Sequence, residues 1–143
     1  MLFHHVLAAF DGSKAAEKAL ATAVKLVECK QANRLTVVHV WSAPAMVMAD
    51  ALVTAPASIQ RDWAEQAQLL LQEAGDKIVH LPYAHTELLE GRPGEAILDS
   101  AERNGCSLIV LGSRGLSPIR EFVLGSVSHE VTVRAKVPVL IVK

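Results

Sequence analysis

Hydrophobic positions along this chain follow two spacings that alternate from one end to the other. Residues 14–28 carry small and apolar side chains every three or four positions, which is helical spacing, whereas residues 34–40 form a short run rich in β-branched side chains. These patterns predict strands at Phe3–Phe10, Arg34–Val40, His80–Glu90, Ser107–Leu111 and Val137–Val142, and helices at Lys14–Glu28, Ser58–Ala74, Gly94–Asn104 and Ser126–Ala135.

The regular alternation of strand and helix predicts the fold class. It indicates an α/β protein with a five-stranded, parallel, doubly wound sheet that has helices on both faces. The chain has 143 residues and shows no repeat or linker, so we expect a single domain over residues 1–143. Ligands of such sheets bind where the strand order reverses, at the carboxyl ends of the strands. We expect this point to lie between the first and fourth strands, which would bring Asp11 close to Gly112.

Two local features complete this outline. Residues Ser42–Ala57 are apolar but contain Pro44 and Pro56, and we expect a long loop there. Such a loop either moves over a bound ligand or forms a hydrophobic contact between subunits, and the sequence favours neither. Gly75 is expected to end the second helix.

Composition and charge narrow the classes of function. Hydrophobic residues make up 51% of the chain and aromatic residues only 4%, as expected of a parallel sheet buried under helices. The net charge is −1 and there is no basic block, which argues against nucleic acid as a partner. No signal peptide and no apolar run of membrane-spanning length is recognisable, so we expect a cytoplasmic protein without a membrane partner. The six histidines lack metal-ligand spacing, and His5 and His39 are expected to be ordinary packed or hydrogen-bonded residues.

The segment after the fourth strand carries the strongest chemical signal. Gly112, Gly115 and Gly125 are followed directly by Ser126, which we expect to cap the last helix. Glycines let a ligand approach main-chain N–H groups, and a helix N-terminus attracts anions. The segment is therefore interpreted as a phosphate-binding site. The alternative is a plain connection between a strand and a helix, which also needs glycine.

The spacing of these glycines resembles the signature of the universal stress protein family. Gly112 and Gly115 are separated by two residues, and nine more precede the Gly125–Ser126 pair. Further segments are similar to motifs of that family in the same order: Val6–Ser13, Val38–Val40, Gly91–Gly94 and Val137–Val142. The resemblance covers essentially the whole chain.

This resemblance implies a fold, a ligand and an assembly. The fold would be a three-layer sandwich of the flavodoxin-like or adenine nucleotide alpha hydrolase-like kind. The assembly would be a homodimer paired through Val137–Val142. Members with the complete glycine signature form the ATP-binding branch, so the expected ligand is ATP, or AMP or ADP, together with Mg²⁺.

Site residues are carried over from the family by position. The ribose side of the nucleotide would lie near Ala9 and Asp11, and the adenine near Val40. The ribose and α-phosphate would be wrapped by Gly112, Ser113, Arg114 and Gly115. The β- and γ-phosphates would be held by Gly125, Ser126 and Val127. Asp11 is also the candidate ligand for Mg²⁺, and the alternative is that it only holds a turn and caps the first helix.

The residues around the glycine segment bear on whether ATP is hydrolysed. The chain has no G-x-x-x-x-G-K-[S/T] motif and no lysine beside the glycine segment. Glu121 and Glu130 flank that segment, but nothing singles out either one as a general base. The sequence therefore favours a nucleotide-responsive regulatory protein with little or no turnover that acts on an unidentified protein partner. A nucleotide-independent dimeric scaffold and a slow ATPase or nucleotidyl transferase remain open as alternatives.

Overall fold

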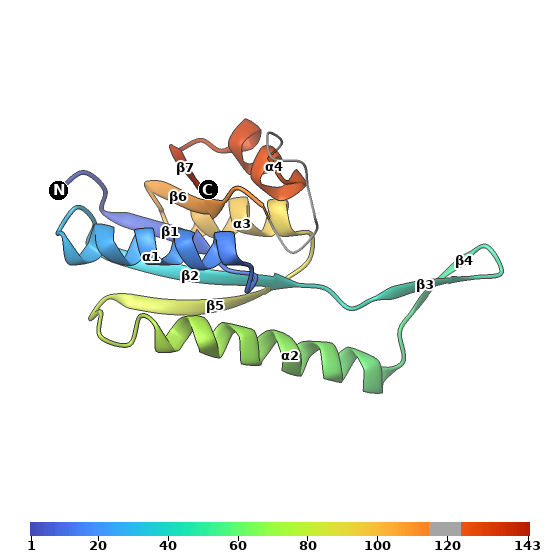
Figure 1. The fold of residues 1–143 in the computed structure, drawn as a ribbon. Helices are drawn as coiled ribbons and strands as arrows, with labels where there is room; N and C mark the ends of the chain where they lie inside the picture. Colours follow the sequence, from blue (N-terminus) through green and yellow to red (C-terminus); the bar gives the residue numbers. More distant parts are fainter. Residues whose placement is uncertain (115–123) are drawn as a thin grey trace.

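The computed structural model describes residues 1–114 and 124–143. Its main sheet has five parallel strands in the order β5-β2-β1-β6-β7 (Figure 1). Their bounds are β1 His5–Ala9, β2 Arg34–Trp41, β5 Ala84–Glu90, β6 Leu108–Gly112 and β7 Val139–Val142. The predicted parallel α/β fold is therefore confirmed.

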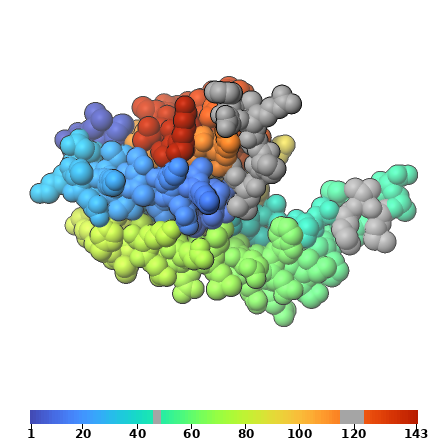
Figure 2. Space-filling model, in the orientation of Figure 1, coloured from blue at the N-terminus to red at the C-terminus, as the bar shows by residue number. Residues whose placement is uncertain are grey.

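Four helices cover the two faces of this sheet and make three layers. On one face lie α1 (Lys14–Glu28) and α2 (Ala57–Asp76), whose side chains form a continuous surface in Figure 2. On the other face lie α3 (Pro93–Arg103) and α4 (Ser126–Arg134). Successive side chains of β1 point to opposite faces, so Val6 packs with α1 and Leu7 packs with α3 and α4. Both side chains are fully buried.

The strand order reverses between β1 and β6, as expected from the sequence. From β1 the chain passes through α1 to β2 on one side, and from β6 it passes through α4 to β7 on the other. The order differs from the 2-1-3-4-5 order of flavodoxin itself, but in both arrangements the switch point lies beside the first strand. The chain therefore leaves β1 and β6 toward opposite sides of the sheet, and the carboxyl ends of these two strands mark the switch point.

The prediction of a long loop over Ser42–Ala57 is wrong for most of its length. Strands β3 (Ala45–Met48) and β4 (Ala51–Thr54) pair as an antiparallel hairpin, which projects away from the sheet (Figure 1). The two-residue turn has Ala49 and Asp50 at φ angles of 49° and 61°. These left-handed angles are those of the tight turns that match the twist of two paired strands. The prolines lie outside the paired residues and therefore do not prevent pairing.

The expected end of the second helix at Gly75 is also wrong. Helix α2 continues to Asp76, and Gly75 lies inside its last turn. Two tight turns follow, and they bring Ile78 and Leu81 into the hydrophobic core. Tertiary packing therefore decides where this helix ends. In the part of the chain that the structure describes, no helix is both long and apolar enough to cross a membrane.

Candidate functional site

A pocket of about 230 Å³ opens at the switch point, at the carboxyl ends of β1, β2 and β6. The loop after β1, the ends of β2 and β6, and the first turns of α3 and α4 form its walls. Its lining residues are Ala9, Phe10, Asp11, Ala16, Val38, His39, Val40, Pro93, Ile97, Leu111, Gly112, Arg114, Gly125, Ser126, Val127 and Ser128.

Eight of the ten residues predicted from the sequence line this pocket: Ala9, Asp11, Val40, Gly112, Arg114, Gly125, Ser126 and Val127. Ser113 is adjacent but is not part of the lining, and Gly115 lies outside the described residues. None of the described hairpin residues belongs to the lining, which separates that segment from the pocket in this structure. The fold thus brings the predicted residues together, and their contacts with a ligand remain predictions.

The turn between β1 and α1 holds Asp11 at the pocket. Its Oδ1 accepts a hydrogen bond from the N–H of Ser13 at 2.9 Å, and Gly12 between them has a φ of +81°. The Ser13 hydroxyl in turn accepts from the N–H of Ala16 at 3.1 Å, so Ser13 is the N-cap of α1. Asp11 therefore does hold a turn. Its Oδ2 has no hydrogen-bond partner among the described residues and stays available at the pocket.

The N-terminus of α4 forms the opposite wall. The N-cap is Gly125, with φ −59° and ψ 156°, and its carbonyl accepts the first helical hydrogen bond, from His129 at 2.9 Å. The prediction that Ser126 is the N-cap is therefore wrong, because Ser126 is already the first helical residue. No side chain of the described residues caps this helix. Its first N–H groups and the positive end of its dipole face the pocket, which suits an anion.

Backbone contacts hold this helix end in place. The N–H of Gly125 donates to the Ser113 carbonyl at 2.9 Å, and the Ser128 hydroxyl donates to the Gly112 carbonyl at 2.7 Å. The N–H of Ser113 donates to Val142 at the end of β7, at 2.8 Å. Ser113 thus links the last strand to the start of α4 through its main chain.

Eight lining residues were not predicted as part of the site, and three of them are polar or belong to a motif of the sequence: His39, Pro93 and Ser128. The Nδ1 of His39 lies 2.8 Å from the Phe10 carbonyl, and because a carbonyl only accepts, this nitrogen carries the proton. The expectation that His39 is hydrogen-bonded is confirmed. The structure also places His39 in the pocket lining. Pro93 begins α3, and its motif was visible in the sequence. These residues could not be assigned to the site from the sequence, because the sequence does not show which strand ends and helix ends meet.

Asp11 is the acidic residue in the described lining of the pocket, and it limits how a metal ion could be held there. The described residues contain no group of three His, Cys, Asp or Glu side chains arranged to hold a metal ion. Asp11 would therefore act alone. Mg²⁺ is commonly held by one or two carboxylates, with substrate phosphates and water completing its octahedron. The site fits Mg²⁺ that arrives together with phosphate groups.

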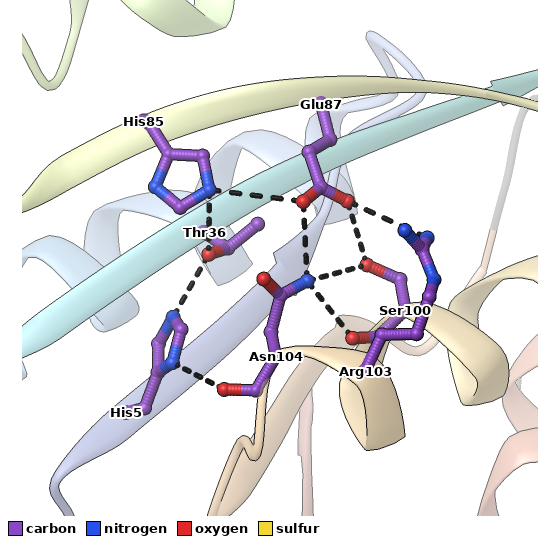
Figure 3. Close-up of polar contacts among 7 residues, drawn as sticks. All are labelled: His5, Thr36, His85, Glu87, Ser100, Arg103 and Asn104. Carbon is purple, nitrogen blue, oxygen red and sulfur yellow. Dashed lines mark hydrogen bonds and ion pairs between the residues drawn. The ribbon is translucent and has the colours of Figure 1, made fainter.

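A separate polar network lies at the other end of β1 (Figure 3). His5 Nδ1 lies 3.0 Å from the Asn104 carbonyl, and His5 Nε2 lies 2.8 Å from the Thr36 hydroxyl. Because the carbonyl only accepts, Nδ1 carries the proton, and neutral His5 accepts at Nε2 from Thr36. Thr36 can then accept from His85 Nε2, at 3.3 Å. The hydrogen bonds therefore share one direction: His85 on the edge strand donates to Thr36, and Thr36 donates to the buried His5.

Glu87 joins the same network from β5. Its carboxylate accepts from the Ser100 hydroxyl at 2.9 Å and from the Asn104 amide at 3.1 Å, and Arg103 lies 3.8 Å away. Burial alone would raise the pKa of Glu87, but these hydrogen bonds and the nearby cation outweigh it and lower the pKa. The pKa of His5 is also lowered, mainly by burial, although the bond to Asn104 opposes the shift.

The lowered pKa of His5 leads to a prediction about acid stability. The unfolded chain takes up a proton near the ordinary histidine pKa of 6.5, whereas the native protein resists it. The free energy of unfolding should therefore be level above about pH 6.5 and fall as the pH drops below that value. The lowered pKa of Glu87 should add a further loss below its ordinary value of 4.5. Urea unfolding at several pH values from about 3 to about 8 measures both steps.

A histidine-to-glutamine pair provides the control for this profile. His5→Gln should remove much of the fall just below pH 6.5, whereas His80→Gln, at a half-exposed side chain, should leave it in place. Equal profiles in the two variants would contradict the assignment to His5.

Comparison with known proteins places the chain in a family. The chain is a three-layer α/β domain with a parallel sheet, a pocket at its switch point and a helix N-terminus in the pocket wall. The model of the universal stress protein family matches residues 2–143. The chain belongs to the universal stress protein family.

Individual relatives cover the chain along its full length. The universal stress protein YxiE of Bacillus subtilis is 37% identical over 149 residues, which cover 99% of this chain and all of YxiE. A solved universal stress protein in complex with cAMP is 24% identical, with a TM-score of 0.74 over 100% of this chain and 99% of its own. A universal stress protein from Archaeoglobus fulgidus in complex with dAMP is 22% identical, with a TM-score of 0.65 over 100% of both chains. These two structures show a shared fold.

Proposed function

We propose that this protein binds ATP together with Mg²⁺ in the switch-point pocket and acts as a nucleotide-responsive regulator with little or no turnover. The observation that carries the proposal is the N-terminus of α4, which no side chain of the described residues caps and which faces a pocket that also contains Asp11 and Arg114. Further support comes from the relatives in complex with cAMP and dAMP, both of which are adenine nucleotides.

The pocket has a division of chemistry that suits a nucleotide. Val38, Val40 and Ile97 provide an apolar wall for the base. The N–H groups at the start of α4 suit phosphates, and the guanidinium of Arg114 suits them as a charged donor. Asp11 lies between these two parts in the proposal, where a carboxylate suits ribose hydroxyls or a phosphate-bound Mg²⁺.

The proposal of little or no turnover rests on the cations in the pocket. Fast phosphoryl transfer uses a lysine, metal ions and often an arginine finger to neutralise the transition state. No lysine belongs to the described lining, and Arg114 is its one arginine. This favours binding over catalysis, and a slow ATPase is the alternative to be tested.

The proposed assembly is a homodimer paired through Val137–Val142. β7 is an edge strand of the sheet, and one side of its backbone is therefore open to pairing. Leu140 in its centre is 38% exposed. In this proposal, the effect of bound nucleotide would be passed to a protein partner through the dimer.

The proposed function is tested first on the purified protein. The protein is denatured, and the released small molecules are separated by ion exchange against nucleotide standards. Calorimetric titration with Mg-ATP, Mg-ADP and AMP follows. Bound ATP, or saturable binding of Mg-ATP, supports the proposal. Absence of both overturns it and favours the nucleotide-independent scaffold. Sustained release of phosphate would instead favour the slow ATPase or, with pyrophosphate, a nucleotidyl transferase.

The proposed role of Asp11 predicts different changes in ATP affinity with and without Mg²⁺. Asp11→Asn retains an oxygen for the turn hydrogen bond to Ser13 but removes the charge. With Mg²⁺ present, ATP affinity should fall about tenfold, since a metal contact is lost. Without Mg²⁺, it should be unchanged or higher, because a repulsive carboxylate is gone. Titrations with and without EDTA measure both. A variant that binds Mg-ATP like the native protein would exclude Asp11 as a metal ligand.

A further inference from the structure

The carboxylate of Glu130 on α4 sits against the first turn of α3. A Cβ atom built on Gly94 would lie 1.9 Å from Glu130 Oε2 and 2.5 Å from its Cδ. The carboxylate therefore occupies the volume that any other residue at position 94 would fill. Gly94 is the second residue of α3 and follows Pro93, which lines the pocket.

The charge of Glu130 suits this place. The N-cap of α3 is Arg92, whose side chain makes no capping hydrogen bond, so the positive end of the α3 dipole lacks a cap of its own. Oε2 of Glu130 is shielded from solvent and has no hydrogen-bond partner among the described residues, and Arg134 lies 3.6 Å from it. A carboxylate beside a helix N-terminus is stabilised by the helix dipole. Glu130 thus adds a second negative charge at the start of α3, whose own first turn contains Glu95.

This contact acts beside others that locate α4, including the burial of Val131 in the core. Two hydrogen bonds, Gly125 to Ser113 and Ser128 to Gly112, attach the helix to the end of β6. Glu130 attaches it to α3. Since α3 contributes Pro93 and Ile97 to one side of the pocket and α4 contributes its first N–H groups to another, Glu130 connects these two walls.

We propose that Glu130, seated on Gly94, is a positioning residue that sets where the N-terminus of α4 stands in the pocket and thereby the affinity for the phosphates of the ligand. This role rests on the proposed nucleotide function. It assigns to Glu130 no contact with the nucleotide and no proton transfer.

Three variants test this role in the full-length chain. Gly94→Ala displaces the carboxylate but retains its charge, Glu130→Ala removes it, and the third variant combines both. Each single change should weaken Mg-ATP binding about tenfold, and the double variant should bind no more weakly than Glu130→Ala, because the two residues act through one contact. AMP binding should change by less than about threefold, since AMP lacks the β- and γ-phosphates proposed to lie at α4.

Glu95→Ala is the matched control. Glu95 lies in the same first turn of α3, pairs with Arg92 at 3.7 Å and is half exposed. The Glu95→Ala substitution removes one negative charge from the same helix end and leaves the Glu130 contact in place. Mg-ATP binding should therefore stay within about twofold of the native value. Thermal melts confirm folding of each variant. Gly94→Ala moves only the end of a flexible side chain and keeps the test valid if Glu130→Ala fails to fold.

The outcomes separate the two proposals. If the native protein binds Mg-ATP but the single variants bind equally well, the role of Glu130 is overturned and the proposed function stands. The same holds if their effects multiply in the double variant, or if ATP and AMP weaken alike. If the native protein binds no nucleotide, the proposed function fails and this role with it.

Discussion

Gly112→Ala should lower the free energy of unfolding by about 2–3 kcal/mol, the cost of overpacking a closely packed site. A Cβ at this position would lie 2.7 Å from the backbone carbon of Ala15, 2.8 Å from its Cβ and 2.9 Å from the backbone nitrogen of Ala16. These atoms belong to the first turn of α1 and cannot rotate away as a side-chain tip can. Gly112 is therefore glycine because β6 ends against α1.

Gly75→Ala is the matched control and should have the opposite sign. Gly75 lies inside α2, and its added Cβ would meet Thr86 at an ordinary 3.7 Å. Alanine within a helix is favoured over glycine by about 0.5–1 kcal/mol, so this variant should be more stable than the native protein. Urea unfolding of both variants measures the difference. If Gly112→Ala is as stable as the native protein, the close packing of β6 on α1 is not as described.

The same substitution reports on the site. The Gly112 carbonyl accepts from Ser128, one of the contacts that locate α4. Its packing against α1 also determines where the pocket floor lies. The sequence left two reasons open for this glycine, the approach of a ligand and a plain connection between strand and helix, and the structure adds a packing requirement that exists without any ligand.

Thr36→Val should cost about 1–3 kcal/mol, because it leaves a buried acceptor without its donor. Thr36 is fully buried, and its hydroxyl joins His5 to His85 (Figure 3). Valine has nearly the same shape, so the core remains filled while the Nε2 atom of His5 loses its hydrogen bond. The loss should therefore come from hydrogen bonding alone.

Thr22→Val separates this effect from the general cost of exchanging a threonine. The Thr22 hydroxyl donates at 2.9 Å to Lys18 of its own helix, at an exposed position. Water can replace that bond, so the change should stay within about 0.5 kcal/mol. Equal losses of stability in the two variants would argue against the buried hydrogen-bond chain.

Much of the fold was predictable because it depends on short-range patterns. The alternation of helical and β-branched segments indicates the five parallel strands and the helices that cover them. Because every parallel strand ends at the same edge of the sheet, the residues directly after strands one and four could be expected to meet. Asp11 and Gly112 do line one pocket.

The errors occur where contacts between distant segments decide. Gly75 is a plausible helix stop by itself, but the helix predicted to end at Ala74 continues to Asp76, and the chain then turns to bury Ile78 and Leu81. The hairpin of β3 and β4 depends on the pairing of two segments that have little strand character separately. Ser126 is a better N-cap by residue type than Gly125, but the bond between Gly125 and Ser113 places the glycine at that position.

By itself, the sequence determined the order of the elements, the parallel sheet, the family resemblance and most members of the candidate site, because periodicity and motif spacing are local properties. The tertiary structure alone decided which residues complete the pocket, such as His39 and Pro93, and which side chain fills the space beside Gly94. The carboxylate of Glu130 that fills this space comes from a helix more than thirty residues away. Such a contact depends on how α3 and α4 pack on the sheet. Local patterns in the sequence do not show which residues of two separate helices will meet.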